Sequence, residues 1–166
     1  MSDKIGKYLR EFPEYFSRGV GFWFRGDGGT GKTAAAVVLG KEALLWGCST
    51  YYTTFSRLQA AVKHKEIFED NVTIESRVHS VDFLILDDFP AYEESKDWGF
   101  NTKQVFNLLK HRNENLKASV VVVVDAGLVS SVGALSNERS ALNNLSTLYF
   151  SGKDRRVTAA PELVIE

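Results

Sequence analysis

The chain has 166 residues and a formal net charge of −1, with 44% hydrophobic and 25% charged residues. This length fits one domain with its own core, and the charge balance excludes a protein that binds nucleic acid over its whole surface. The single cysteine, Cys48, excludes an internal disulfide, and there is no run of 18 apolar residues and no signal-peptide pattern. We therefore expect one domain over residues 1–166, located in the cytoplasm.

The first half of the chain alternates apolar runs with helical patterns. Aromatic residues at mixed helical spacing within 6–18 predict a short amphipathic lead-in, and the apolar run at 20–25 predicts a buried strand. A glycine-rich loop followed by a helix is expected over 26–46. A run of β-forming residues at 49–54 then predicts a second strand, and 56–66 predicts an amphipathic helix.

The second half continues this alternation after a polar stretch. The apolar run at 81–86 predicts a strand that ends in two aspartates, and 101–116 predicts a helix. The β-branched run at 119–124 predicts a fully buried central strand, and 145–150 predicts a fifth strand. The expected fold is therefore α/β, with a five-stranded parallel sheet covered by helices on both faces.

The most informative stretch lies between the first strand and the first long helix, where the sequence fits G-x-x-x-x-G-K-[ST] at every fixed position. Glycines let backbone N–H groups turn inward around a polyphosphate, and the helix N-terminus adds partial positive charge. We expect Lys32 to face solvent until it reaches the β- and γ-phosphates, and Thr33 to bind Mg²⁺, so the expected cofactors are ATP and Mg²⁺. The alternative is a glycine-rich turn that only caps the helix. The residues expected to bind the nucleotide are Gly26, Asp27, Gly28, Gly29, Thr30, Gly31, Lys32 and Thr33.

The strand predicted at 81–86 delivers Asp87 and Asp88 to its carboxyl end, the edge where ligands bind in such sheets. Asp87 would hold the Mg²⁺ shell, and Asp88 would orient and deprotonate the attacking water. The alternative is a solvated Asp-Asp turn after a core strand. The position of the pair, with one strand between it and Lys32, favours the two-part ATP site.

With these residues placed, the chain resembles the AAA+ ATPases of the DnaC/DnaI helicase-loader and IstB-like group. The resemblance implies a P-loop NTPase fold of the AAA+/ASCE type. The resemblance spans nearly the whole chain and rests on GDGGTGKT (26–33) with its run-up EYFSRGVGFWFRG (14–26), TTFSRL (53–58), DFLILDDF (82–89), VFNLLKHRNE (105–114) and FSGKDRR (150–156).

The resemblance assigns further roles to arginines. It implies that Arg156, or else Arg155, is a sensor-2 arginine that touches the γ-phosphate. Arg112 matches an arginine before the fourth strand that faces a neighbouring subunit, and the alternative is a plain surface arginine at a helix end.

The chain departs from the family pattern at two positions. Asp125 stands where the family has a polar sensor-1 residue, usually asparagine, and its charge would sit poorly beside a γ-phosphate. Asn144 stands where the family has its arginine finger, which leaves Arg139 as the nearest candidate for that catalytic role.

The segment after the second strand carries the candidate DNA contacts. Basic side chains there would track phosphates, and Phe68 would stack on a base. The alternative is the solvated face of an amphipathic helix. The basic candidates are Arg57, Lys63, His64, Lys65 and Arg77.

The leading functional hypothesis is an ATP-dependent DNA-replication accessory protein of the helicase-loader type. The implied partners are single-stranded DNA, a replicative helicase or other replication protein, and further copies of this chain in a nucleotide-dependent homo-oligomer. A nucleotide-switched binding module with little turnover is the alternative that Asp125 and the missing finger favour. A small P-loop kinase is a third, although its Arg-rich lid is missing because 126–145 contains only Arg139.

Overall fold

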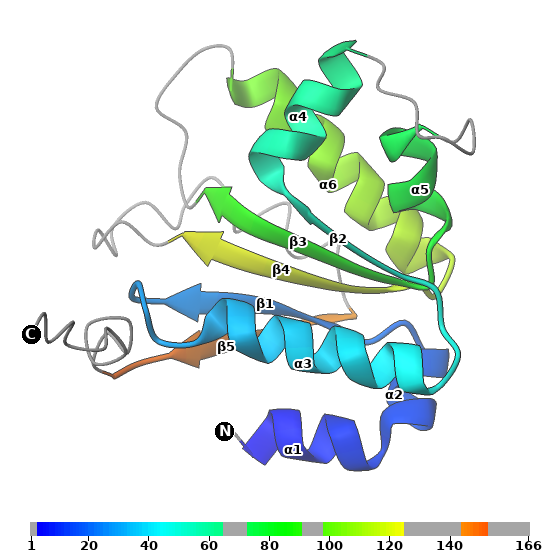
Figure 1. Ribbon diagram of the computed structural model, residues 1–166, viewed down its shortest axis with the longest axis vertical. Helices are drawn as coiled ribbons and strands as arrows, with labels where there is room; N and C mark the ends of the chain where they lie inside the picture. The colour runs from blue at the N-terminus through cyan, green and yellow to red at the C-terminus, as the bar shows by residue number, and fades with distance from the viewer. Residues whose placement is uncertain (1–2, 65–72, 91–97, 125–143, 153–166) are drawn as a thin grey trace, which may run out of the picture.

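Five parallel strands form the centre of the molecule (Figure 1). The computed structural model describes residues 3–64, 73–90, 98–124 and 144–152. The strand order is β2-β3-β4-β1-β5, so the first strand pairs with the fourth and fifth. This sheet confirms the predicted α/β fold. The strands are β1 (Gly21–Gly26), β2 (Thr50–Thr54), β3 (Phe83–Pro90), β4 (Ala118–Val124) and β5 (Leu145–Phe150).

Helices cover both faces of the sheet, with α1, α2 and α3 on one face and α4, α5 and α6 on the other (Figure 1). The helix α5 was missing from the predicted elements, because its apolar signal consists of Ile74 and Val78 alone. Thr73 opens it as an N-cap, its hydroxyl oxygen accepting the Ser76 N–H at 3.0 Å. The helices are α1 (Asp3–Arg10), α2 (Phe12–Ser17), α3 (Lys32–Leu45), α4 (Phe55–His64), α5 (Ile74–Ser80) and α6 (Trp98–Glu114).

Alternation along the strands divides the hydrophobic core into two clusters. On β1, Phe22 and Phe24 pack beneath α1, α2 and α3, whereas Trp23 packs beneath α4, α5 and α6. Residues 118–123 of β4 are buried in the middle of the sheet, which confirms the predicted central strand except at Val124, which is exposed. A sheet buried on both faces holds its strand ends in fixed positions, and those ends carry the polar groups described below.

A buried arginine ties the amino ends of β3 and β4 to α5 and α6. The side chain of Arg112 is 0% exposed, and its Nε donates to Ser119 Oγ at 2.9 Å. Its Nη1 donates to the Val78 and Val81 carbonyls at 2.8 Å, and its Nη2 donates to the Ala118 carbonyl at 2.7 Å. Both roles predicted for Arg112, a surface position and contact with a neighbouring subunit, are therefore wrong. The α6 helix points this side chain inward, where it donates to backbone carbonyls at the ends of neighbouring elements.

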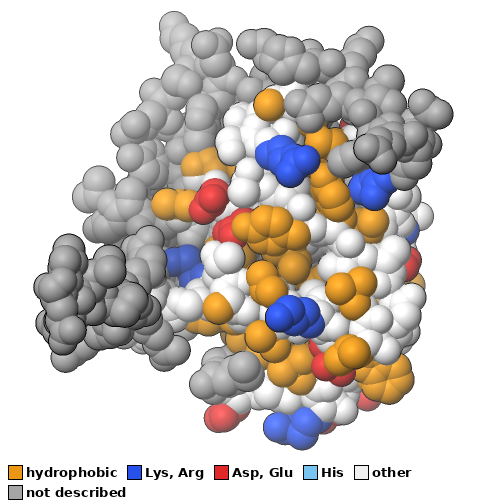
Figure 2. Space-filling view, in the orientation of Figure 1, with side chains coloured by type: hydrophobic (Ala, Val, Ile, Leu, Met, Phe, Trp, Pro, Cys, Tyr) orange, Lys and Arg blue, Asp and Glu red, His pale blue; other side chains and the backbone are white. Residues whose placement is uncertain are grey.

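The long helix α3 is apolar on its outer face as well. It packs on the sheet through small residues, which lets the helix approach the strands closely. Its outer face and carboxyl end form part of the hydrophobic surface seen in Figure 2. The exposed hydrophobic residues there are Val37, Val38, Leu44, Leu45 and Trp46.

Candidate nucleotide site

The carboxyl ends of β1 and β3 bring the two predicted motifs together. The loop after β1 leads directly into α3, whose second residue is Thr33, and β3 delivers Asp87 beside it. Thr33 Oγ1 lies 3.4 Å from Asp87 Oδ1, although 54 positions separate the two residues. A hydroxyl and a carboxylate at this distance are placed to share the coordination shell of one Mg²⁺ ion.

Two glycines of the loop occupy positions that a side chain would disturb. Gly31 is the N-cap of α3 with φ 95°, in the left-handed region. Gly26 has φ 123°, and a Cβ there would lie 1.9 Å from the Phe150 carbonyl oxygen of β5. Within the loop, Thr30 Oγ1 donates to the Asp27 carbonyl at 2.7 Å. The sequence pattern thus corresponds to a compact loop that opens a helix N-terminus.

The loop wraps around the side chain of Lys32. Its ammonium donates to the carbonyls of Gly26 at 2.5 Å and Asp27 at 2.7 Å, and the residue is 8% exposed. The prediction that Lys32 faces solvent was therefore wrong. The reason is local, because the loop turns back over the lysine and presents its carbonyl dipoles to the charge.

The two aspartates lie at an irregularity in β3. The register between β3 and β4 shifts between Leu86 and Phe89, and Asp88 has φ 54°. Asp87 is 3% exposed, whereas Asp88 lies on the surface. The Asp88 N–H donates to Asp87 Oδ1 at 2.8 Å. Burial, followed by the neighbouring Asp87 charge, raises the pKa of Asp88 above its ordinary value.

Sequence reasoning missed one member of this site, Tyr52. Its hydroxyl donates to Asp87 Oδ2 at 2.7 Å from the neighbouring strand β2. In the β2–β3 register Thr54 is opposite Asp87, and Tyr52 shares the face of Thr54 two residues earlier. Diagonal neighbours of this kind are within reach of a long aromatic side chain. The contact between Tyr52 and Asp87 depends on β2 lying next to β3, and the sequence alone does not show which strands are neighbours.

The residues present fit a magnesium ion that is held jointly with phosphate. Thr33 and Asp87 offer oxygen ligands, which Mg²⁺ prefers, but they are too few to enclose it. In the part of the chain that the structure describes, no group of three or more histidine, cysteine or acidic side chains is placed to hold a metal. Phosphate oxygens and water would therefore have to complete the shell.

Several predicted residues lie outside the described part of the chain and are not placed by it. They are Lys65, Phe68, Asp125, Arg139, Arg155 and Arg156. Asn144 is described, and its Nδ2 donates to the Arg18 carbonyl at 3.0 Å. Since its own carbonyl accepts the N–H of Gly21, at the start of β1, Asn144 lies at the sheet edge opposite the phosphate loop.

The candidate DNA contacts are spread over two helices. Arg57 is exposed on α4, whereas the guanidinium of Arg77 on α5 lies 6.0 Å from the centre of the Tyr51 ring. Lys63 and His64 belong to the last turn of α4. Arg57 and Arg77, the basic candidates whose side chains the structure describes, lie on different helices.

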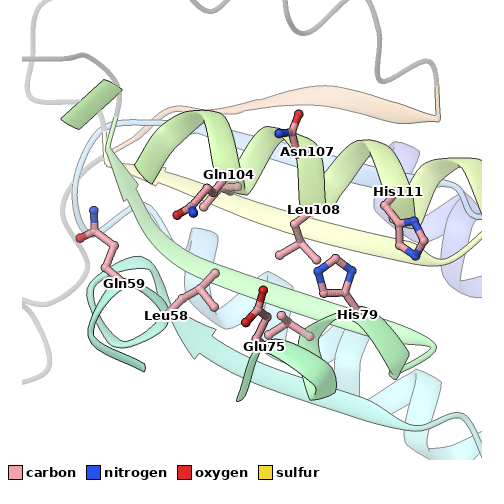
Figure 3. Close-up of a pocket in the computed structure, with 10 residues that line it drawn as sticks. Leu58, Gln59, Glu75, His79, Gln104, Asn107, Leu108 and His111 are labelled. Carbon is pink, nitrogen blue, oxygen red and sulfur yellow. The ribbon is translucent and has the colours of Figure 1, made fainter. Parts of the chain in front are cut away.

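A cavity of about 320 Å³ opens between α4, α5 and α6 (Figure 3). Leu58 and Leu108 give it apolar walls, and Glu75, His79 and His111 add polar groups, with the two histidine rings 5.2 Å apart. Burial lowers the pKa of His79, and the nearby His111 adds to this shift. The cavity shares no residue with the nucleotide site.

Comparison with known proteins supports the same interpretation of the fold. The DnaC helicase loader crystal structure matches with a TM-score of 0.67 and 23% identity, over 89% of this chain and 86% of that one. A DnaI crystal structure matches with a TM-score of 0.66 and 18% identity, over 92% of this chain and 83% of that one. AMPPCP-bound DnaA from Aquifex aeolicus matches with a TM-score of 0.61 and 19% identity, over 92% of this chain and 47% of that one. At these identities the likeness establishes a shared fold.

The sequence itself identifies the family. No curated protein matches it significantly. None of the helices in the described ranges is long and apolar enough to cross a membrane. The sequence profile described as IstB-like ATP binding protein matches residues 16–135, which is well over half of the chain. The chain therefore belongs to the family of IstB-like ATP-binding proteins, as its motifs predicted.

Proposed function

We propose that this protein binds Mg²⁺-ATP at the carboxyl edge of its sheet and hydrolyses it. The observation that carries the proposal is the convergence of the loop lysine, Thr33, Asp87 and Asp88, delivered by two strands with β4 between them. In the ATP complex Lys32 would exchange its loop carbonyls for β- and γ-phosphate oxygens, which are stronger partners for an ammonium. The glycine loop and the N-terminus of α3 would surround the phosphates with N–H groups.

The environments of the two aspartates support separate roles. Asp87 is buried and contacts Thr33, so it would hold the Mg²⁺ shell together with that hydroxyl. Asp88 is exposed and its pKa is raised, which brings it closer to the range of an effective general base. It would orient the attacking water and take its proton, while Mg²⁺ neutralises the charge on the phosphates. Arg156 and Arg139 remain the proposed arginines of this reaction, on the family pattern alone.

We further propose that ATP use serves DNA replication, through single-stranded DNA and a replicative helicase or another replication protein. The support is the shared fold with the DnaC helicase loader, with DnaI, and with a DnaA initiator solved with AMPPCP and single-stranded DNA. Such a protein would act in the cytoplasm and assemble with further copies of itself when nucleotide is bound.

The direct test is ATP turnover with and without single-stranded DNA, alongside a sizing experiment with AMPPCP. DNA-stimulated turnover together with assembly supports the loader function. Nucleotide binding without turnover supports the nucleotide-switched module instead. Failure to bind Mg²⁺-ATP at all would contradict the proposed function.

The DNA contacts require their own variants. Lys63→Glu/Lys65→Glu should weaken single-strand binding and lower the salt dependence, by about 0.7 in log–log slope for each lost phosphate contact. Lys4→Glu/Lys41→Glu is the matched control, because both lysines are exposed and lie on α1 and α3, on the opposite side of the sheet from α4. Equal affinities and slopes in the two double variants would remove Lys63 and Lys65 from the DNA surface.

A further inference from the structure

The carboxylate of Asp87 is held from three directions. Its Oδ1 accepts the Asp88 N–H at 2.8 Å and lies 3.4 Å from the Thr33 hydroxyl, and its Oδ2 accepts the Tyr52 hydroxyl at 2.7 Å. The contacts of Oδ1 come from the loop–helix junction and from β3 itself. The contact of Oδ2 comes from the neighbouring strand, so Tyr52 fixes the second oxygen and thereby limits rotation of the carboxylate plane.

This orientation matters because the two oxygens face different groups. A carboxylate has a broad rotational preference about its last side-chain bond, so a single anchored oxygen leaves the other free to swing. With Oδ2 anchored by Tyr52, Oδ1 points toward Thr33, the side chain that would bind the ion directly. Small displacements of positioning groups have large effects on reactions of bound substrates.

We propose that Tyr52 is a positioning residue of the Mg²⁺-nucleotide site, whose hydroxyl holds Asp87 in the orientation that presents Oδ1 to the metal shell. This inference rests on the proposed function, because it concerns the ion bound with ATP. Tyr52 itself touches neither phosphate nor metal in this scheme. It acts through Asp87.

The tyrosine keeps its proton under the conditions in which the site would work. A tyrosine hydroxyl has an ordinary pKa of about 10. Its hydroxyl is therefore a permanent donor at neutral pH. Since Tyr52 is 44% exposed, removing its hydroxyl opens no cavity in the core.

The test compares Tyr52→Phe with Tyr51→Phe. Both variants lose one hydroxyl from the same strand, but Tyr51 packs against the cluster beneath α4, α5 and α6 rather than toward Asp87. The measurement is AMPPCP affinity, titrated against Mg²⁺ and repeated in EDTA, together with ATP turnover. In Tyr52→Phe the half-saturating Mg²⁺ concentration should rise about tenfold, the size expected for one hydrogen bond to a charged group.

Three further results are expected for Tyr52→Phe. The affinity for AMPPCP in EDTA should equal that of the wild type, because the phosphate loop is unchanged. Turnover should fall mainly through kcat at limiting Mg²⁺ and recover as Mg²⁺ is raised. The melting temperature should change no more than in Tyr51→Phe.

The outcomes separate this inference from the function on which it rests. If the wild type binds AMPPCP with Mg²⁺ dependence and Tyr52→Phe has the same dependence, Tyr52 is no positioning residue while the ATP site stands. Equal Mg²⁺ shifts in Tyr52→Phe and Tyr51→Phe would also overturn it, because the effect would then belong to the strand. If the wild type shows no Mg²⁺-dependent nucleotide binding, both the proposed function and this inference fall.

Discussion

The two ends of strand β3 use charged side chains in opposite ways. At the amino end, Asp82 accepts the N–H and hydroxyl of Ser49 at 3.0 and 2.6 Å, and Arg112 donates to carbonyls around it. At the carboxyl end, Asp88 is exposed and has a raised pKa, and Lys32 is held by two loop carbonyls. At the amino end the charged groups bind other groups of the protein, whereas at the carboxyl end they are placed to bind a ligand.

The buried cation at each end makes the contrast specific. The guanidinium of Arg112 is planar, and its fixed donors reach Ser119 and the backbone carbonyls of Val78, Val81 and Ala118. Burial lowers its pKa to about 10, so it remains charged at neutral pH. Lys32 is a point charge on a flexible stem and can change partners without breaking a rigid network. We infer that Arg112 stabilises the fold and Lys32 serves the ligand.

The largest effect on stability is expected for Arg112→Lys. A lysine keeps the charge but cannot reach the same acceptors, so buried carbonyls and a buried ammonium would lack partners. We expect a loss of about 3–5 kcal/mol in the free energy of unfolding, measured with urea. Arg57→Lys, an exposed change on α4, is the control and should stay within about 0.5 kcal/mol. A loss below about 1 kcal/mol in Arg112→Lys would show that the amino end is not held by this side chain.

A smaller effect is expected for Asp82→Asn at the same end. The Ser49 hydrogen bond, with help from Lys117 and Arg112, lowers the pKa of Asp82 below 3.8. The ionised form is therefore favoured in the folded state, and its stabilisation is present above pH 3.8 and is lost as the pH falls through the folded pKa. Because the side chain is partly exposed, we expect a loss of no more than about 1 kcal/mol at neutral pH.

Urea unfolding of wild type and Asp82→Asn over a pH series provides the measurement. The difference between them should shrink toward zero as the solution is acidified below the folded pKa. A difference that stays constant with pH would mean that the hydrogen-bond geometry, rather than the charge, carries the effect.

The smallest effect on stability, with the opposite sign, is expected for Asp88→Asn. A raised carboxyl pKa means that the ionised form opposes folding, and this penalty disappears as the pH falls below 3.8. Asparagine removes the charge and tolerates the positive φ, so the melting temperature should rise by about 1 °C at neutral pH. ATP turnover should fall about 10²–10⁴-fold, while Mg²⁺-ATP affinity is retained. Turnover at the wild-type rate would remove Asp88 from the reaction.

The sequence predicted the carboxyl end of β3 better than its amino end. The glycine loop, Lys32 and Thr33 follow a fixed spacing, because phosphate binding constrains consecutive backbone positions, and the two aspartates directly follow an apolar strand. The roles of Arg112 and Tyr52 depend on which strands are neighbours and on how far a side chain reaches between elements. A local sequence pattern shows neither the order of the strands nor the contacts between distant elements. Arg112 was therefore placed on the surface, and Tyr52 was treated as an ordinary strand residue.

The helices show the same division. The long amphipathic elements α4 and α6 carry enough periodic residues to be recognised. The short helix α5 has only Ile74 and Val78 facing the core, and its existence depends on packing against α4 and α6. The buried position of Lys32 likewise depends on how the loop closes over it.

The most direct test of the nucleotide site is Mg²⁺-ATP binding by Lys32→Ala, with urea unfolding measured on the same preparation. Lys41→Ala is the control, since Lys41 is exposed on the same helix α3. We predict that Lys32→Ala weakens ATP binding by about 100-fold or more, because charge-assisted contacts with phosphate are lost. Its unfolding curve should remain cooperative, and Lys41→Ala should bind like the wild type. A folded Lys32→Ala protein with wild-type ATP affinity would contradict the account.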